Sequence, residues 1–155
     1  MTRQFDPDSF GFVLTDVARM LRAELDRRIA DAGLGLTPGE GRALSHAARA
    51  GEARQTVIAE RMGVEAMTLS SYLDRLEQRG LIERVPDPAD RRAKLVRLTG
   101  EAQDVLVAIG RISAGIRNDL LRAVDPAQWE QLNLSLRLLR DELSLLRSER
   151  ESAVA

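Results

Sequence analysis

Apolar residues recur at every third or fourth position along most of the chain, which is the spacing of a stripe on one face of an α-helix. The first stripe, within residues 9–29, consists of Phe10, Val13, Leu14, Val17, Leu21, Leu25 and Ile29. Asp8 or Ser9 can cap the start of this helix, and Gly33-Leu34-Gly35 can end it, because glycine readily takes the left-handed conformation after a last turn. The pattern predicts a long amphipathic helix.

A second helix is predicted from residue 37 to about residue 49. Thr37 is a good N-cap, and Pro38 suits the first helical position. Glu40 lies three residues after the cap, which is the spacing of a capping box.

Two shorter helical patterns follow, at residues 55–62 and 65–79, joined by a tight turn at Gly63-Val64. Gly80 ends the second of them. Their shared core is predicted to contain Val57, Ile58, Met62, Val64, Leu69, Leu73 and Leu76. A short helix, a turn with glycine and a second helix make a helix-turn-helix arrangement, although many helical hairpins look alike.

Residues 81–85 and 94–98 alternate apolar and polar side chains, which is the pattern of half-buried β-strands. The polar, turn-rich residues 86–93 between them predict a β-hairpin with a long tip. A hairpin directly after a helix-turn-helix is a wing. We therefore expect a mainly α fold with a small β-wing.

The last third returns to helical spacing, with one helix at residues 101–123 and another that Asp125 caps and Pro126 begins. The final helix carries Leu132, Leu134, Leu136, Leu138, Leu139, Leu143, Leu145 and Leu146, more apolar surface than one compact neighbour needs. We expect it to pair with a second subunit. The expected organisation is a dimerisation helix at residues 1–34, a winged helix-turn-helix domain at 35–99, dimerisation helices at 100–147 and a frayed tail at 148–155.

The composition narrows the classes of function. The 155 residues include no cysteine, which excludes disulfides, thiol oxidation as a sensor and zinc sites that need sulfur. Residues 1–7 have no signal-type apolar core, and no apolar run approaches the roughly 18 residues of a membrane span. We expect a cytoplasmic protein without a membrane partner. The formal net charge of -1 by itself argues weakly against nucleic acid.

The distribution of charge changes that picture. Residues 75–97 contain seven basic and four acidic residues. Residues 91–97 contain Arg91, Arg92, Lys94 and Arg97 and no acidic residue. Binding to duplex DNA depends on local neutralisation of phosphates, so a basic wing suffices in an acidic protein. A solvated strand face is the alternative for the basic run alone.

The second helix of the helix-turn-helix presents small and hydroxyl side chains opposite its apolar stripe. Thr68, Ser70 and Ser71 can hydrogen-bond phosphates or base edges, and Arg75 lies one turn further on. Ordinary solvation of these side chains is the alternative. Their place in the motif favours contact with a DNA groove.

The chain resembles the MarR-type winged helix regulators, and within them the SlyA-like branch. The resemblance is carried by Gly63-Val64, the run TLSSYLDRLEQRGLIERV at residues 68–85 and DRRAKLVRLT at residues 90–99, and it extends over residues 10–146. It implies a dimer whose recognition helices enter major grooves. It also implies roles for single residues: Thr68, Ser71 and Arg75 face the major groove, Arg92 is the wing arginine in the minor groove, Asp90 orders the wing through it, and Arg91 and Lys94 contact phosphates.

Three positions depart from the family pattern. Gly41 stands where relatives often have an aromatic residue facing an effector pocket, Ala102 replaces a common glycine, and Ala66-Met67 differs from many relatives. The first departure puts the usual pocket for planar ligands in doubt, and the last means that the operator sequence cannot be borrowed.

The sensing mechanism has few candidates. A single histidine, His46, and four scattered methionines make no metal site, so neither a metal nor a cofactor is expected. The resemblance implies a small lipophilic or phenolic ligand, which Arg19, Arg22, Thr37 and His46 could line, although each suits an exposed surface equally well.

The sequence thus predicts a homodimeric DNA-binding transcriptional regulator, expected to repress from a pseudo-palindromic operator. An enzyme is not expected, because the sole histidine has no nucleophile in a recognisable frame and no phosphate loop is present. The alternative is a winged-helix interaction module that has lost DNA binding.

Overall fold

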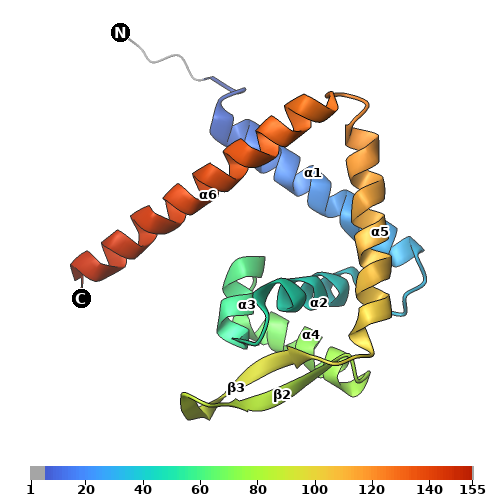
Figure 1. Ribbon diagram of the computed structural model, residues 1–155, viewed down its shortest axis with the longest axis vertical. Coiled ribbons are helices and arrows are strands. Elements are labelled where there is room, and N and C mark those ends of the chain that lie inside the picture. The colour runs from blue at the N-terminus through green and yellow to red at the C-terminus, as the bar shows by residue number, and fades with distance from the viewer. Residues whose placement is uncertain (1–5, 155) are drawn as a thin grey trace. The chain divides into compact units, whose positions relative to one another are not determined.

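The computed structural model describes residues 6–154, which contain six helices and three short strands (Figure 1). In chain order these are α1 (Phe10–Asp31), α2 (Pro38–Ala50), β1 (Ala53–Arg54), α3 (Gln55–Met62), α4 (Ala66–Gln78), β2 (Ile82–Asp87), β3 (Asp90–Leu98), α5 (Ala102–Leu120) and α6 (Pro126–Val154). The expected mainly α fold with a small β-wing is confirmed. The expectations about residues 1–5 and Ala155 lie outside the described residues.

The chain divides into two compact units, with the boundary after Ala114. The first contains α1 and the segment from α2 to β3, residues 38–98, which we call the winged unit. The second contains the end of α5 and the whole of α6.

The predicted capping box begins helix α2. The hydroxyl oxygen of Thr37 accepts a hydrogen bond from the Glu40 amide at 3.3 Å, and Glu40 Oε2 accepts one from the Thr37 amide at 2.9 Å. Pro38 occupies the first helical position, as its fixed φ favours. These reciprocal bonds place Glu40 in the interior, only 5% exposed.

The helix-turn-helix forms at the predicted turn. Gly63 takes a left-handed conformation with φ of 64°, so the amides of Gly63 and Val64 can bond back to the carbonyls of α3. Leu69, Leu73 and Leu76 of α4 are fully buried in the core. The prediction was wrong for Val57, which is 37% exposed, while the smaller Ala59 is buried instead.

The sheet has three strands in the order β1-β3-β2, all antiparallel, rather than a hairpin alone. Strand β1 has only two residues, too few to show an alternating pattern. The expected long tip at residues 86–93 was also wrong: β2 and β3 continue almost to the turn, which consists of Pro88 and Ala89. Figure 1 shows β2 and β3 extending as a ribbon beyond the helices of the winged unit.

Close packing joins the helices of the first unit. Glycine at Gly39 lets α2 approach α4, because a Cβ atom there would lie 2.4 Å from the Tyr72 ring. Gly41 is buried, and a Cβ atom there would meet Ile29 of α1 at 3.2 Å. Aliphatic side chains thus fill the space beside Gly41, the position at which relatives often have an aromatic residue.

Helix α6 begins at the predicted cap, where the side chains of Asp125 and Gln128 each accept the other residue's amide. It continues to Val154, past residue 147, after which a frayed tail was expected. An ion pair between Arg147 and Glu151 at 2.9 Å supports the helix beyond that point. Within residues 6–154, no helix combines the length and apolar character needed to cross a bilayer.

Candidate nucleic-acid interface

Helix α4 exposes the hydroxyl side chains expected to face DNA. Thr68 and Ser71 are exposed, and Ser70 is half-buried at the flank. All three lie away from the buried stripe of Leu69, Leu73 and Leu76, which α4 packs against the core. Hydroxyl groups in this position can donate to phosphates or accept and donate at base edges.

Arg75 of α4 and Arg79, the C-cap residue of α4, are held by residues 34–40, the segment that leads into α2. Arg75 donates to Glu40 Oε1 at 3.2 Å. Arg79 donates to the carbonyl oxygens of Gly35 and Leu34. Glu40 is buried and its other carboxylate oxygen is already bonded, so Arg75 balances its charge. The contact of Arg75 with the major groove therefore stays a prediction, and in the chain as described its guanidinium has a structural partner.

The wing carries bases without acidic partners. Arg91, Arg92 and Lys94 are exposed, and the structure gives none of their side chains a carboxylate partner within residues 6–154. The register shifts between Pro86 and Asp87, because Pro86 pairs with Lys94 whereas Asp87 pairs with Asp90. The three extra residues of β3, Arg91–Ala93, form a bulge that carries both arginines. Bulges of this kind re-aim side chains out of a regular ladder.

Asp90 orders this bulge through the backbone. Its Oδ1 accepts the amide of Arg92 at 3.1 Å. The expected ordering of the wing by Asp90 through Arg92 stays a prediction: in the structure the Asp90 carboxylate bonds to the Arg92 amide, and within residues 6–154 the Arg92 guanidinium has no acidic partner. The short separation of two residues suits a turn formed by an aspartate side chain.

Arg54 anchors the wing and was missed by the sequence analysis. Its guanidinium bonds to Asp87 Oδ2 at 2.7 Å and lies 3.6 Å from Asp90. Asp87 is 7% exposed, and its Oδ1 accepts the Ala89 amide at 2.8 Å. The Ala89 amide and then Arg54 hold the pKa of Asp87 below its ordinary value. No local pattern could reveal this pair, because 33 residues separate its members.

The other bases of the region are paired. Arg84 bonds to Asp74 and Glu77 of α4, and Arg97 bonds to Glu83 on the neighbouring strand. The excess of positive charge read from the sequence therefore concentrates at Arg91, Arg92 and Lys94.

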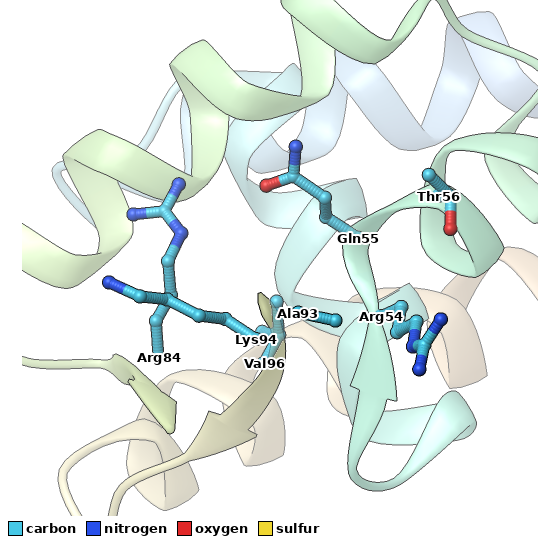
Figure 2. A pocket seen from close by; sticks show the side chains of 7 residues that line it. All are labelled: Arg54, Gln55, Thr56, Arg84, Ala93, Lys94 and Val96. Carbon is cyan, nitrogen blue, oxygen red and sulfur yellow. The ribbon is translucent and has the colours of Figure 1, made fainter. Parts of the chain in front are cut away.

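An open hollow of about 360 Å³ lies between the start of α3 and the wing (Figure 2). Its lining comprises Arg54, Gln55, Thr56, Arg84, Ala93, Lys94 and Val96. Lys94 and Arg84 extend to the same side in this view, and Arg54 lies on the other. No side chain caps the first amides of α3, so these amides and Lys94 can together donate hydrogen bonds to a phosphate oxygen. Gln55 and Thr56 carried no signal in the sequence.

The comparisons with known proteins agree with this geometry. The family model for the MarR family matches residues 36–94. The crystal structure of transcriptional regulator PA3341 is 37% identical, with 87% of this chain and 98% of that chain covered and a TM-score of 0.70. This chain belongs to the MarR family. Its MarR membership makes it a transcriptional regulator rather than an enzyme.

Two further MarR-like structures show the same fold. CouR from Rhodococcus jostii RHA1, solved with bound p-coumaroyl-CoA, is 25% identical, with 88% of this chain and 94% of that chain covered and a TM-score of 0.68. The apo form of MarR from E. coli is 20% identical, with 87% and 98% covered and a TM-score of 0.72. Assignment to the SlyA-like branch of the MarR family stays a prediction.

The four residues expected to line an effector pocket do not come together. Thr37 is bonded in its capping box, and His46 lies nine positions further along α2, a rise of about 13 Å. Arg19 and Arg22 border a shallow apolar hollow on α1, and Arg19 pairs with Asp16. Arg22 is one of the charges that act on His46.

His46 itself is a half-buried group in positive surroundings. Its Nδ1 atom is buried without a hydrogen-bond partner. Burial lowers its pKa, and so do the charges of Arg49, Arg42, Arg22 and Arg61. Within the described residues, no group of three or more histidine, cysteine or acidic side chains could hold a metal ion.

Proposed function

We propose that this regulator is a homodimeric repressor that binds a pseudo-palindromic operator. The observation that carries the proposal is the wing bulge, in which Arg91 and Arg92 project from a backbone fixed by Asp90 and have no acidic partner among residues 6–154. A charge held in place but not neutralised within its own chain is suited to a polyanion. Duplex DNA supplies such a partner.

In the proposed complex, α4 enters the major groove and the wing follows the backbone into the minor groove. Thr68 and Ser71 face base edges, while Arg92 reaches the minor groove, whose negative potential attracts arginine. Lys94 and the uncapped start of α3 hold a phosphate between these two contacts. Ser70 and Arg91 add contacts to the backbone, and Arg75 contributes mainly by keeping α4 in place against Glu40.

The dimer proposal rests on apolar surface that the chain leaves uncovered. On α1 this surface includes Phe10, Val13, Val17 and Leu21, and on α6 it includes Leu132, Leu139, Leu143 and Leu146. Stripes of this length are typical of helices that pair between subunits. A twofold dimer would set two copies of α4 about one DNA turn apart, ~34 Å, so that each reads one half-site.

A small organic anion is the proposed effector. The positive surroundings of His46, to which Arg22 contributes from α1, support an anionic ligand. CouR, a similar structure, was solved with p-coumaroyl-CoA, which is an anion with a phenolic group. A ligand that changes the separation of the two recognition helices would change operator affinity.

The test of DNA binding compares two arginine variants in a gel-shift titration with the DNA upstream of the protein's own gene. Arg92→Ala should weaken binding at least tenfold while the protein remains folded and dimeric. Arg150→Ala removes the same charge from α6, away from any proposed contact, and should bind like the wild type. A salt series should show a steep fall in wild-type affinity and a shallower slope for Arg92→Ala.

Unchanged affinity of Arg92→Ala would refute the role of the wing. Failure of the wild type to bind any duplex would instead favour a winged-helix interaction module. Repeating the gel-shift titration in the presence of phenolic anions tests the proposed effector. A repressor is expected to release its operator when the effector binds.

A further inference from the structure

Met67 is the most exposed large apolar side chain within residues 6–153, at 86%. The next most exposed, Leu143 and Phe10, belong to the apolar faces of α6 and α1, where a second copy can cover them. In the winged unit, the only other described side chain of this class is Val57 of α3, at 37%. A single exposed apolar residue is common on protein surfaces, so exposure alone does not assign Met67 a role.

Its position in α4 is more informative. Met67 is the second residue of the helix, after the N-cap Glu65 and Ala66. At about 100° per residue, Met67 lies roughly 160° around the helix from the buried Leu69, with Ser71 one turn later on the same side. In helix-turn-helix proteins, the N-terminal residues of the second helix are those that contact base edges.

The chemistry of the side chain limits what it can recognise there. A thioether has no hydrogen-bond donor, and its sulfur is only a weak acceptor, so it cannot read the donor and acceptor pattern of a base pair. The one apolar group that base pairs present in the major groove is the C5 methyl group of thymine. Methionine is flexible and polarisable, and therefore suits contact with a methyl group whose position varies between sites.

We propose that Met67 is a specificity-determining residue that reads a thymine methyl group in each operator half-site. The inference rests on the proposed DNA-binding function and deepens it. Thr68 and Ser71 beside it supply hydrogen bonds, whereas Met67 supplies the apolar contact and favours A·T pairs at its position. A protein or membrane partner would require a contiguous apolar patch, but the exposed neighbours Ala66, Thr68 and Ser71 are small or polar.

The experiment removes the methyl group from the DNA and the side chain from the protein in turn. The wild-type dimer first selects its operator from a pool of random duplexes. Each thymine of the selected operator is then replaced by uracil, which lacks only the C5 methyl group, and affinities are measured by fluorescence anisotropy. Wild type should lose about fourfold when the contacted thymine of one half-site is replaced, and about fifteenfold when both are.

Three variants complete the cycle. Met67→Ala should bind the thymine and uracil operators equally, whereas Met67→Leu, which remains apolar, should keep most of the discrimination. Val57→Ala removes an exposed apolar side chain from α3 and should discriminate as the wild type does. Circular dichroism checks that each variant is folded. The Met67 variants should fold, because the Met67 side chain is exposed.

The outcomes separate this inference from the function on which it rests. If the wild type selects no duplex, both are overturned. If an operator is selected but no thymine can be distinguished from uracil, or if Met67→Ala discriminates as the wild type does, the assignment of Met67 is overturned and the proposed function stands.

Discussion

The winged unit and helix α6 carry similar leucine stripes, but the first stripe is buried and the second is exposed. Leu69, Leu73 and Leu76 of α4 are fully buried within the chain, whereas Leu138 and Leu143 of α6 are about two-thirds exposed. The same helical spacing therefore gives a closed core in one region and an uncovered surface in the other. The difference teaches that periodicity predicts which face of a helix is apolar, but only tertiary contacts show whether its own chain covers that face.

Arginine side chains divide in a parallel way, into paired ones on and beside α4 and β2 and unpaired ones on the wing bulge at residues 91–93. Arg75, Arg79 and Arg84 are bound to carboxylates or carbonyl oxygens of the chain. Arg91 and Arg92 have no such partner within the described residues. Paired arginines hold α4 and β2 in place, while the unpaired ones are available to a polyanion. Each half of this comparison can be tested by substitution.

The largest effect is expected from Leu73→Ala, which opens a cavity in the closed core. We expect the free energy of unfolding to fall by about 3 kcal/mol, measured by urea denaturation at fixed protein concentration. Met67→Ala is the matched control on the same helix, because its exposed side chain should change stability by less than about 0.5 kcal/mol. Equal costs for the two variants would show that the core of the winged unit is not closed.

A second effect is expected on the uncovered face of α6. Introducing Glu at both Leu139 and Leu143 places charges on the surface proposed to pair between subunits. The dissociation constant of the dimer should rise at least about 100-fold, because burying unpaired charges is costly. Sedimentation velocity over a concentration series measures it. Glu149→Gln, a surface change on the same helix, serves as the control, and a dimer that survives both glutamates contradicts the assigned interface.

Much of the fold was predictable because its signals are local. The capping box of Thr37 and Glu40, the glycine turn at Gly63 and the buried leucines of α4 each depend on residues only a few positions apart. Cap and turn preferences operate over that range, so a single sequence contains them.

The remaining features depend on contacts that local patterns do not encode. Arg54 meets Asp87 across 33 residues, and Arg75 meets Glu40 across 35. A two-residue strand such as β1 shows no alternation. The bulge at residues 91–93 interrupts the alternation of β3, so the strand was predicted too short and its tip too long. The bases on the wing were predicted, but their freedom from acidic partners emerged only with the geometry.

A third, smaller effect should distinguish held from unpaired arginines. Arg75→Ala leaves the buried Glu40 without its partner and should cost about 1 kcal/mol, a value kept low because the Arg75 side chain is itself more than half exposed. Combining it with Glu40→Gln should cost less than the sum of the two single variants. Arg92→Ala should leave stability unchanged in the same urea titrations. A comparable loss for Arg92→Ala would mean that the wing arginine also has a structural partner.

The smallest expected effect on stability concerns His46, which lies on α2, the helix that packs against α1. Burial lowers its pKa in the folded protein, and so do the positive charges of Arg49 and Arg42 on α2, Arg22 on α1 and Arg61 on α3. The unfolded chain therefore binds a proton more readily than the folded one. The contribution of His46 to stability is fully present above the ordinary pKa of 6.5 and is lost as the pH falls through the lowered folded value.

Urea denaturation at pH 7.5, 6.5 and 5.5 should thus show stability falling toward acid in the wild type, with a shallower fall in His46→Gln. Arg22→Gln removes one neighbouring charge and should give a shallower fall than the wild type, because the folded pKa of His46 rises toward its ordinary value and the penalty for protonation shrinks. Identical profiles for the wild type and His46→Gln would show that the arginines of α1, α2 and α3 do not act on this histidine. The positive field proposed to attract an anionic effector would then lose its support.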